Sequence, residues 1–553
     1  MAFNIADLFE RTVDVVGDRP ALIVGDDRLT YADVEERANR LAHHLADHGV
    51  GPGDHVGIHG QNSTEWMVTM IAAFKLRAVP ININFRYVED ELAYLFDNAD
   101  LVALVHDVAY APRVAAVAPG IEKLRHLVAM PGPPDAESTA AAEDPEVTAA
   151  LEQLGSVPFA AALASGSPER DFGERSPDDH YVLYTGGTTG MPKGVVWRHE
   201  DVFFALGGGI DAYTQERVTS DTQLAEKAAA TENPMVTLSA PPLMHGAAQW
   251  STLRFWFEGG TVVFTPRFSP HGVWETIERE KVTTVMITGD AMARPMIEAL
   301  EEDPSRYDLS SLFVVSSSAA VFSPTVKDRY LELIPNALII DSIGSSEGGM
   351  NGMIAVQKGQ TEMKGGGPTV TPSRDAVVLD DDLKPVVPGS GVIGRVARGG
   401  NIPIGYYKDE AKTAATFVTA ADGRRYVVPG DFATIEADGS ITLLGRGSVC
   451  INSGGEKIFP EEVEAALKAH PEVYDCVVVG VPDERWGSTV AAVVQPRHPD
   501  TPPSLDDLDA HCRTRIAGYK IPRQLHLVAE VLRSPAGKPD YPWATRLAAG
   551  TDN

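Results

Sequence analysis

A glycine-rich loop with one lysine is the first part of this sequence whose residues could do chemistry. Residues 184–195 read YTGGTTGMPKGV and directly follow an apolar run. Glycines expose consecutive backbone N–H groups and Lys193 adds a positive charge, so the loop has the donors that a polyphosphate needs. It lacks both the P-loop spacing G-x-x-x-x-G-K-[ST] and the dinucleotide-binding spacing G-x-G-x-x-G. From its residues alone, the loop is either a flexible surface turn or the phosphate site of a different family.

Five further segments carry side chains that could act on a nucleotide or an acid. Their most reactive members, Glu347, Asp431 and Lys538, each have a common structural role when considered singly. A buried glutamate is usually a structural partner, an aspartate after Pro-Gly is a turn residue, and a lysine in a Pro-Gly turn is usually exposed. In chain order the segments are PPLMHG (241–246), SIGSSEGG (342–349), YVVPGD (426–431), LLGRGSVCINSGGEK (443–457) and SPAGKPD (534–540).

The glycine-rich loop and these five segments, in this order, resemble the signature of the adenylate-forming superfamily. That superfamily includes acyl-CoA synthetases, luciferases and the adenylation domains of peptide synthetases, and the resemblance runs over nearly the whole chain. It implies an enzyme in which a carboxylate attacks the α-phosphorus of ATP to give an acyl-adenylate and pyrophosphate. In an acyl-CoA synthetase the thiol of coenzyme A then displaces AMP. The resemblance therefore implies ATP, Mg²⁺ and coenzyme A.

The resemblance assigns the glycine-rich loop to the leaving pyrophosphate. Backbone N–H groups, threonine hydroxyls and Lys193 would stabilise negative charge that develops in the transition state. Thr185 is also implied as a contributor near the metal ion. The loop residues implied in binding are Thr185, Gly186, Gly187, Thr188, Thr189, Gly190 and Lys193.

Glu347 corresponds to the magnesium ligand of the family, and its carboxylate is the type of oxygen donor that a hard cation takes. The family has a tyrosine four residues before this glutamate and a threonine directly before it, whereas this chain has Ile343 and Ser346. An isoleucine cannot stack on adenine as an aromatic ring does, although it can pack an apolar face there. The remaining nucleotide contacts that the resemblance implies are Ala320, Gly344, Ser345 and Ser346, with Asp431 and Arg446 at the ribose.

Lys538 is the residue that the resemblance places at the first chemical step. An ammonium group between the carboxylate and the α-phosphate would offset the repulsion of two anions. His245 is implied beside the acyl pocket, while Gly454 and Gly455 are implied at the pantetheine tunnel, where small residues let a narrow arm pass close to the backbone. Ser448 occupies the family's hinge position, which is usually Asp or Lys, and rotation there would remove Lys538 before CoA transfer.

The elements that must position these residues are predicted from alternation along the chain. Strand-like HVGIHG (55–60), helix-like STEWMVTMIAAFKL (63–76) and strand-like LVALVHD (101–107) indicate parallel sheets covered by helices. From about residue 390, short glycine-punctuated strands indicate an antiparallel, barrel-like part, and Arg398 there matches no family motif and is expected at the surface.

The predicted fold is α/β. It has a large N-terminal AMP-binding domain (1–446) of parallel sheets flanked by helices, together with a small β-barrel. A small, mobile α+β C-terminal domain (447–553) follows, with helices at 460–471 and 505–516 and strands at 476–482 and 489–495.

Composition narrows the class of protein. With 553 residues the chain is too long for one core, and its net charge of −30 disfavours nucleic acid or anionic membrane as a partner. The three cysteines show no C-x-x-C spacing, the first residues do not resemble a signal peptide, and no run approaches the length of a membrane span. We expect a cytoplasmic enzyme acting on small molecules, with a homodimer possible because dimers are common in the superfamily.

Acid:CoA ligase is the activity predicted. A peptide-synthetase module is disfavoured because no carrier domain follows SPAGKPD, and a binding protein would be expected to lose Lys538, Glu347 or the glycine-rich loop. A luciferase-like side activity stays open, because it shares the first step.

Within the ligases, the sequence most resembles the actinobacterial enzymes that thioesterify cholesterol side-chain acids. The segments that carry this resemblance include FRYVEDELAYLFDNAD (85–100), SGSPERDFGERS (165–176) and TGDAMARP (288–295). Small residues in LGGGID (206–211), HGAA (245–248) and SSSAA (316–320) would leave room for a fused-ring acid such as cholestenoate, or they would only let elements pack closely. A general medium- or long-chain fatty acyl-CoA synthetase is the alternative.

Overall fold

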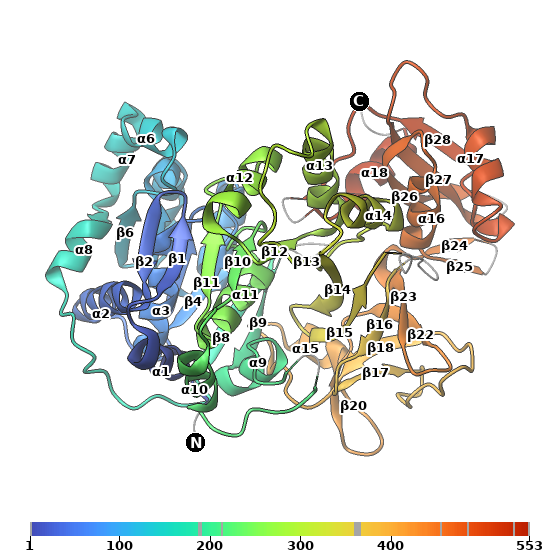
Figure 1. The fold of residues 1–553 in the computed structure, drawn as a ribbon. Coiled ribbons are helices and arrows are strands. Elements are labelled where there is room, and N and C mark those ends of the chain that lie inside the picture. The colour runs from blue at the N-terminus through green and yellow to red at the C-terminus, as the bar shows by residue number, and fades with distance from the viewer. Residues whose placement is uncertain are drawn as a thin grey trace. The chain divides into compact units, whose positions relative to one another are not determined.

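The computed structural model describes residues 3–185, 191–211, 214–358, 367–453, 456–483, 486–534 and 537–550. These residues fall into two units, each made of several stretches of the chain (Figure 1). Unit 1 comprises Met1–Met286, Tyr307–Leu312 and Asn401–Ala415, and unit 2 comprises Ile287–Arg306, Phe313–Gly400 and Thr416–Asn553. The boundary predicted between residues 446 and 447 lies inside unit 2 and stays a prediction.

A sheet of eight strands in unit 1 carries the glycine-rich loop. Its order is β19-β9-β8-β4-β3-β5-β6-β7, with parallel pairing from β8 to β7 and antiparallel pairing of β8 with β9 and of β9 with β19. Every residue of β3, β4 and β5 is buried, as expected for strands covered on both faces. The strands are β3 (His55–His59), β4 (Val79–Ile83), β5 (Leu101–Asp107), β6 (His126–Met130), β7 (Val157–Pro158), β8 (His180–Thr185), β9 (Lys193–Arg198) and β19 (Gly405–Tyr406).

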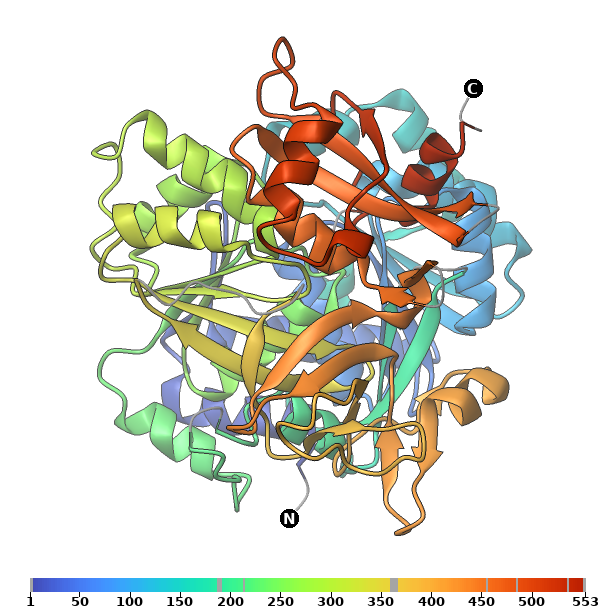
Figure 2. The ribbon, with the colours of Figure 1, turned by 90° about the vertical axis from the view of Figure 1, so that its right-hand side faces the viewer.

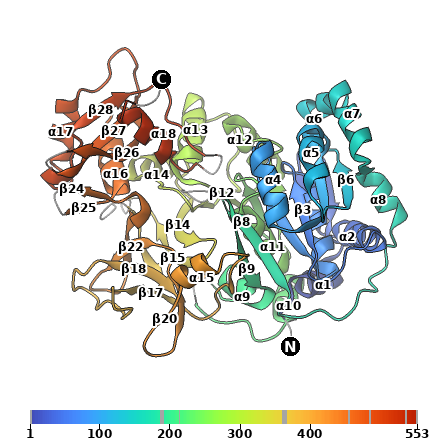
Figure 3. The ribbon, with the colours of Figure 1, turned by 180° about the vertical axis from the view of Figure 1, so that it is seen from behind.

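Helices cover this sheet from both sides (Figure 3). α4 (Glu89–Asn98) and α5 (Ala111–Val117) contribute Leu92, Phe96 and Val114 to one core cluster with the strands. α3 (Thr64–Lys75), which Ser63 caps, packs against β3 and β4, and α2 (Tyr31–Asp47) packs on α3. The helix predicted at 63–76 and the strands predicted at 55–60 and 101–107 are therefore confirmed.

Unit 1 also contains five strands in the order β2-β1-β11-β10-β12, of which β1, β11, β10 and β12 pair in parallel. Buried helices, including α1 (Ile5–Val16) and α11 (Gly246–Phe257), accompany them. The strands are β1 (Pro20–Val24), β2 (Asp27–Thr30), β10 (Val236–Ser239), β11 (Thr261–Phe264) and β12 (Thr284–Ile287). The other helices of unit 1 are α6 (Ala136–Ala142), α7 (Pro145–Leu154), α8 (Phe159–Ser165), α9 (His199–Ala205), α10 (Gln223–Ala230), α12 (Pro270–Glu280) and α15 (Glu410–Thr416).

The middle of unit 2 is built from short, mostly antiparallel strands (Figure 2). The prediction of such strands from about residue 390 is confirmed by β18, β22 and β23. Ile343 packs into the core of this part with Val370 and Val396. The strands are β13 (Val314–Ser317), β14 (Leu338–Ser345), β15 (Gly349–Val356), β16 (Thr369–Pro372), β17 (Ala376–Leu379), β18 (Gly394–Arg398), β20 (Phe417–Thr419), β21 (Arg425–Val427), β22 (Asp431–Ile435) and β23 (Ile441–Arg446), with helices α13 (Gly289–Glu302) and α14 (Pro324–Leu333).

Arg398 is a correction to the sequence-based expectation, because it is buried and not at the surface. Its guanidinium donates to the Met350 carbonyl oxygen and to Ser373 Oγ. Arg398, the last residue of β18, thus bonds to one acceptor in β15 and to another just after β16. No local sequence pattern reveals that these segments meet.

The end of unit 2 is an α+β arrangement around a three-stranded sheet, β26-β27-β28. Alternate residues of β26 face two separate cores: Cys476 and Val478 face one, and Val477 and Val479 face the other. The predicted helices and strands of this region are present, although β26 begins earlier and α16 and α17 end earlier than expected. The elements are β24 (Ile451–Ser453), β25 (Glu456–Ile458), α16 (Pro460–Lys468), β26 (Val473–Asp483), β27 (Gly487–Pro496), α17 (Leu505–Cys512), β28 (Gln524–Leu527) and α18 (Tyr541–Ala548).

Among the described helices, none combines the length and the apolar character that crossing a membrane would require.

Candidate active site

The SIGSSEGG segment forms the tip of a β-hairpin in unit 2. A Cβ at Gly344 would lie 2.5 Å from the Gly349 carbonyl oxygen, so β14 and β15 can approach only without a side chain there. The Gly348 N–H donates to Ser345 Oγ at 2.8 Å. These contacts fix the turn that holds Glu347, which is partly exposed.

Asp431 and Arg446 are cross-strand partners at the ends of two neighbouring strands. Asp431 begins β22, Arg446 ends β23, and the two residues lie opposite each other in the register. Arg446 Nε donates to Asp431 Oδ1 at 3.0 Å. The motifs YVVPGD and LLGRG are separated in the sequence, but the pairing of β22 with β23 brings Asp431 and Arg446 into contact.

Lys538 lies next to Gly537, whose carbonyl oxygen is held by a largely buried ion pair. Arg533 forms an ion pair with Asp475 of β26 at 2.6 Å and donates to the Gly537 carbonyl oxygen at 2.9 Å. Gly537 has a φ of 72°, and a Cβ there would lie 2.6 Å from the Cβ of Ala291. This position thus needs glycine both for its conformation and for its packing on α13.

Glu347, Asp431, Arg446 and Lys538 act on one another electrostatically. Burial lowers the pKa of Lys538, the positive charge of Arg446 lowers it further, and Glu347 and Asp431 oppose that change. Asp431 is the main cause of the raised pKa of Arg446, with Glu347 as a further contributor. The structure therefore brings together in unit 2 four residues that the sequence placed in four different motifs.

This group of residues suits an anion together with a metal ion. Two cations close to each other are stabilised when a phosphate binds between them. Glu347 supplies a carboxylate oxygen, the ligand type that Mg²⁺ takes together with phosphate oxygens and water. The donor set thus fits a magnesium nucleotide.

Glu461 of α16 is a neighbour of this group that the sequence interpretation missed. Its Oε1 accepts from the Arg446 backbone N–H at 3.3 Å, and it lies so close to Gly445 that a Cβ there would be 2.3 Å from Oε2. Burial, with the nearby Glu464 charge second, raises the pKa of Glu461 to about 8. The segment PEEVE gives no local sign of this contact, because only the packing of α16 against β23 creates it.

In unit 1, Thr185 and Lys193 face each other across the β8–β9 hairpin. Residues 186–190, and with them Gly186, Gly187, Thr188, Thr189 and Gly190, lie outside the described residues. Lys193 forms an ion pair with Asp409, which also accepts the Lys412 N–H at 2.9 Å at the start of α15. The hydrogen bond from Lys193 is the main cause of the lowered pKa of Asp409.

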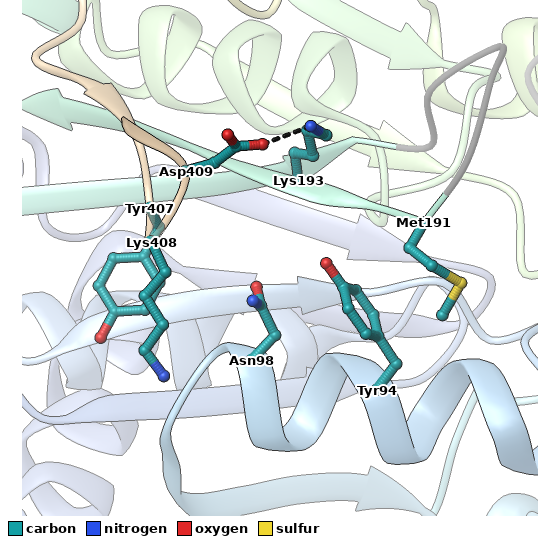
Figure 4. A pocket seen from close by; sticks show the side chains of 7 residues that line it. All are labelled: Tyr94, Asn98, Met191, Lys193, Tyr407, Lys408 and Asp409. Carbon is teal, nitrogen blue, oxygen red and sulfur yellow. Dashed lines mark hydrogen bonds and ion pairs between the residues drawn. The ribbon is translucent and has the colours of Figure 1, made fainter. Parts of the chain in front are cut away.

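Lys193 and Asp409 line a pocket of about 300 Å³ in unit 1 (Figure 4). Lys408 in the same pocket pairs with Asp100 at 2.7 Å. Lys408, the other lysine of this pocket, is thus also paired with a carboxylate. The other lining residues are Tyr94, Asn98, Met191 and Tyr407.

The remaining predicted contacts lie at the ends of strands and helices. His245 of unit 1 directly precedes α11, and its carbonyl oxygen accepts the Ala248 N–H at 3.1 Å.

In unit 2, Ala320 follows Ala319, whose φ of 68° is in the left-handed region that favours glycine. This conformation explains why a glycine is usual before that alanine. Gly454 and Gly455 lie outside the described residues.

The comparison with protein families identifies the class to which these features belong. The model of the AMP-binding enzyme family matches residues 9–407, and that of the AMP-binding enzyme C-terminal domain matches residues 462–538. The chain therefore belongs to the AMP-binding enzyme family, and its similar relatives place it among the acyl-CoA ligases of that family.

Two of these relatives resemble the chain over almost its whole length. A 3-oxocholest-4-en-26-oate–CoA ligase of Rhodococcus rhodochrous is 54% identical over 98% of this chain and 96% of its own. A medium/long-chain-fatty-acid–CoA/3-oxocholest-4-en-26-oate–CoA ligase of Mycolicibacterium smegmatis is 55% identical with the same coverage. The resemblance to steroid-acid and fatty-acid ligases is confirmed.

A solved structure shares the fold. The anthranilate CoA ligase AuaEII, in complex with anthranoyl-AMP, superposes with a TM-score of 0.81 over 99% of this chain and 98% of its own, at 23% identity. At that identity the likeness supports the fold, and the predicted α/β class with a smaller C-terminal part is confirmed.

Proposed function

We propose that this acyl-CoA ligase activates a steroid side-chain acid with ATP and transfers the acyl group to coenzyme A. The observation that carries the chemistry is the grouping of Lys538 with Arg446, Glu347 and Asp431. Identity of 54% to a ligase named for 3-oxocholest-4-en-26-oate supports the substrate class.

In the first half-reaction, Lys538 lies between the acid and the α-phosphate of ATP. Its charge offsets the repulsion between the two anions and stabilises the phosphorus transition state. The pKa of Lys538 is lowered by burial and by Arg446, so an incoming anion is a favourable partner. Asp431 accepts hydrogen bonds from the ribose hydroxyls, and Arg446 contacts the ribose while it holds the Asp431 carboxylate.

Glu347 and Thr185 are the residues that would hold Mg²⁺. The ion supplies positive charge on the phosphates of ATP when it is bound. Lys193 and the loop after Thr185 bind the leaving pyrophosphate, and Asp409 must release Lys193 for that contact.

The second half-reaction needs the same site for a thiol. We propose that rotation near Ser448, which lies in the short 3-10 turn Gly447–Val449, removes Lys538 and brings Gly454 and Gly455 to the pantetheine arm. His245 flanks the acyl pocket. These roles and a homodimer follow from family resemblance, and a cytoplasmic location follows from the composition of the sequence; all are proposals for this chain.

A medium- or long-chain fatty acid is the second candidate substrate, because the similar enzyme of Mycolicibacterium smegmatis carries both substrates in its name. Fused rings would bury a broad apolar surface, at roughly 25 cal/mol for each Å². Within unit 1, the small residues of HGAA would leave volume for such a body.

The substrate is tested with a panel of acids, from acetate through palmitate to C24 and C27 steroid acids, compared by kcat/KM. We expect the highest kcat/KM with a steroid acid. A value for palmitate equal to or above that of both steroid acids would make the enzyme a general long-chain ligase. Release of pyrophosphate that depends on the acid, followed by release of AMP that depends on CoA, would confirm the two half-reactions in the same assay.

A further inference from the structure

Three histidines form a cluster in unit 1, away from the residues assigned to catalysis. His44 lies in the last turn of α2, His48 caps the end of that helix, and His126 begins β6. β6 is separated from β8, the strand that ends at Thr185, by three strands of the eight-stranded sheet. His44 and His126 are buried and His48 is exposed, so the cluster is open to solvent on one side.

Hydrogen bonds determine which ring nitrogen of two of these histidines carries its proton. His48 Nδ1 lies 2.7 Å from the His44 carbonyl oxygen, and a carbonyl only accepts, so His48 is protonated at Nδ1. His44 Nδ1 lies 2.8 Å from Ser165 Oγ, which donates its own proton to the Ala162 carbonyl oxygen at 2.9 Å. Ser165 must therefore accept from His44 Nδ1–H. Both rings are left with the lone pair on Nε2.

The third histidine completes the arrangement. His126 Nε2 lies 3.0 Å from His44 Nε2, and the rings of His126 and His48 stack with their centroids 4.1 Å apart. One ring nitrogen from each of the three residues lies within 4.8 Å of the other two. Tetrahedral zinc with Zn–N bonds near 2.05 Å needs nitrogens about 3.4 Å apart, each with its lone pair in the ring plane and aimed at the ion. The stacked rings of His48 and His126 must therefore turn away from each other to bind the ion.

The environment disfavours protonation of the His44 and His126 rings, and metal ligands must be unprotonated at the binding nitrogen. Burial, with His48 and His44 as further causes, lowers the pKa of His126 to about 4. Burial also lowers the pKa of His44, and Asp47 opposes that change through its negative charge. The His126 ring is therefore unprotonated at neutral pH, and the nearby Asp47 carboxylate favours a cation.

We propose that His44, His48 and His126 bind a divalent late transition-metal ion, with Zn²⁺ as the natural candidate. Three imidazoles leave a fourth position for water, and zinc, copper, nickel and cobalt all accept imidazole nitrogen. The ion replaces the proton between His44 Nε2 and His126 Nε2, and the neutral His126 ring carries its proton on Nδ1 instead. Hydrogen bonds from Nδ1 to a carbonyl and to a serine are the outer contacts that metal-binding histidines usually have.

Such an ion would be structural. It would join the end of α2 to the start of β6 and, through Ser165, to the end of α8, three elements that lie side by side (Figures 1 and 3). Because it binds the folded state, it would raise the melting temperature in a concentration-dependent way.

The test uses the full-length enzyme without a histidine tag, freed of metal by a chelator that is then removed. Titration with ZnCl₂ at neutral pH, followed by calorimetry, is expected to saturate at one ion per chain and to raise the melting temperature. Co²⁺ is expected to give visible absorption bands of a four-coordinate site. Neither readout depends on ligase activity.

Three variants locate the ion. His48→Ala removes an exposed ligand and should abolish the Co²⁺ bands, while Ser165→Ala keeps all three imidazoles and should weaken zinc binding by about 10–100-fold. His43→Ala is the matched control, because His43 is the neighbouring histidine of α2 but faces Glu169 and Asp171. It should bind zinc as the unaltered enzyme does. Far-UV circular dichroism and pyrophosphate release verify that each variant is folded.

Two results would overturn the proposal. The first is the absence of saturable zinc binding by the unaltered enzyme. The second is equal zinc affinity of the folded His48→Ala variant and the unaltered enzyme, which would place the bound ion elsewhere.

Discussion

Lys193 of unit 1 and Lys538 of unit 2 have similar sequence surroundings and opposite electrostatic ones. Both lie in sequence segments rich in glycine and proline, and both are candidates to meet the phosphates of ATP. Lys193 forms an ion pair with Asp409, whereas Lys538 lies near Arg446 and has a lowered pKa. An anion bound at Lys538 would offset the burial of its ammonium group and the repulsion from Arg446. An anion bound at Lys193 would have to displace the Asp409 carboxylate. We therefore expect Lys538 to gain from a bound anion, and Lys193 to bind one only after its ion pair with Asp409 has broken.

The two lysines also differ in the contacts that fix the segments around them. The segment next to Lys538 is fixed by Arg533, whose partner Asp475 also pairs with Lys468 at 3.1 Å in the interior. Lys193 lies at the start of β9, where Asp409 comes from a distant part of the chain. We therefore expect removal of the Lys538 side chain to slow formation of the acyl-adenylate, and changes at Lys193 to alter the KM for ATP.

The largest effect is expected for Lys538→Ala. Formation of the acyl-adenylate should fall by about 150-fold or more, which corresponds to about 3 kcal/mol or more of transition-state stabilisation. Transfer of a supplied acyl-adenylate to CoA should be largely retained. Single-turnover pyrophosphate release and thioester formation measure the two steps separately.

Lys384→Ala is the control for that loss, because Lys384 is an exposed lysine of unit 2 in an exposed ion pair with Asp382. It should change neither step. An equal fall of both half-reactions in Lys538→Ala would show that Lys538 is structural, and the comparison of the two lysines would then lose its basis.

Ser448→Pro asks whether Lys538 must leave the site after it has acted. A proline fixes φ and so resists rotation at this position without altering the reacting groups. Adenylation should persist while CoA transfer becomes the slow step. Ser448→Ala keeps the backbone free and should behave as the unaltered enzyme. Undiminished CoA transfer in the proline variant would place the hinge elsewhere.

The pH dependence of stability tests the environment next to Arg446. Because the pKa of Glu461 is raised from 4.5 to about 8, the folded enzyme binds a proton that the unfolded chain releases in this window. Stability from this group is therefore complete below about pH 4.5 and is lost as the pH rises through about 8. The free energy of unfolding should fall by at most about 1.4 kcal/mol per pH unit from this group.

Urea denaturation across this pH range, compared between the unaltered enzyme and Glu461→Gln, measures that contribution. The glutamine variant should show a flatter profile, because its side chain cannot release a proton. Glu462→Gln is the control: Glu462 pairs with Lys520 at 2.7 Å, so its loss should lower stability without changing the slope. Identical slopes for Glu461→Gln and the unaltered enzyme would mean that Glu461 is ionised at neutral pH.

The smallest effect is expected for Asp409→Asn, which frees Lys193. The ion pair is partly exposed, so its loss is worth about 0.2–1 kcal/mol. The KM for ATP should fall by at most about 5-fold, because Lys193 no longer has to leave a carboxylate. Asparagine preserves the hydrogen bond to the Lys412 N–H at the start of α15.

Asp308→Asn, which breaks the exposed pair with Lys281 at 2.9 Å in the same unit, should leave the KM unchanged. A higher KM for ATP in Asp409→Asn would show that Asp409 positions Lys193 for the nucleotide and does not compete with it.

Local patterns predicted most of the elements and the family correctly. The apolar run of β5 and the Ser63-capped helix α3 depend on residues close in sequence, so their periodicity and caps are readable directly. The six motifs identified the AMP-binding family, because each motif is a short segment whose residue order carries the information.

Contacts between distant segments could not be predicted. Asp409 meets Lys193 from more than two hundred residues away, and Glu461 reaches Arg446 only because α16 packs on β23. Arg398 was expected at the surface and is buried. In each case the partner of a charged group depends on which elements pack together, and no local pattern encodes that choice.

The sequence by itself determined the residue types that can hold a nucleotide and a metal ion, and the order in which they occur. Tertiary structure alone decided their pKa shifts and partners: burial and Arg446 lower the pKa of Lys538, and Asp409 forms an ion pair with Lys193. It also decided that His44, His48 and His126 meet. The physical reason is that desolvation and Coulomb interactions act over a few ångströms in space, whatever the separation along the chain.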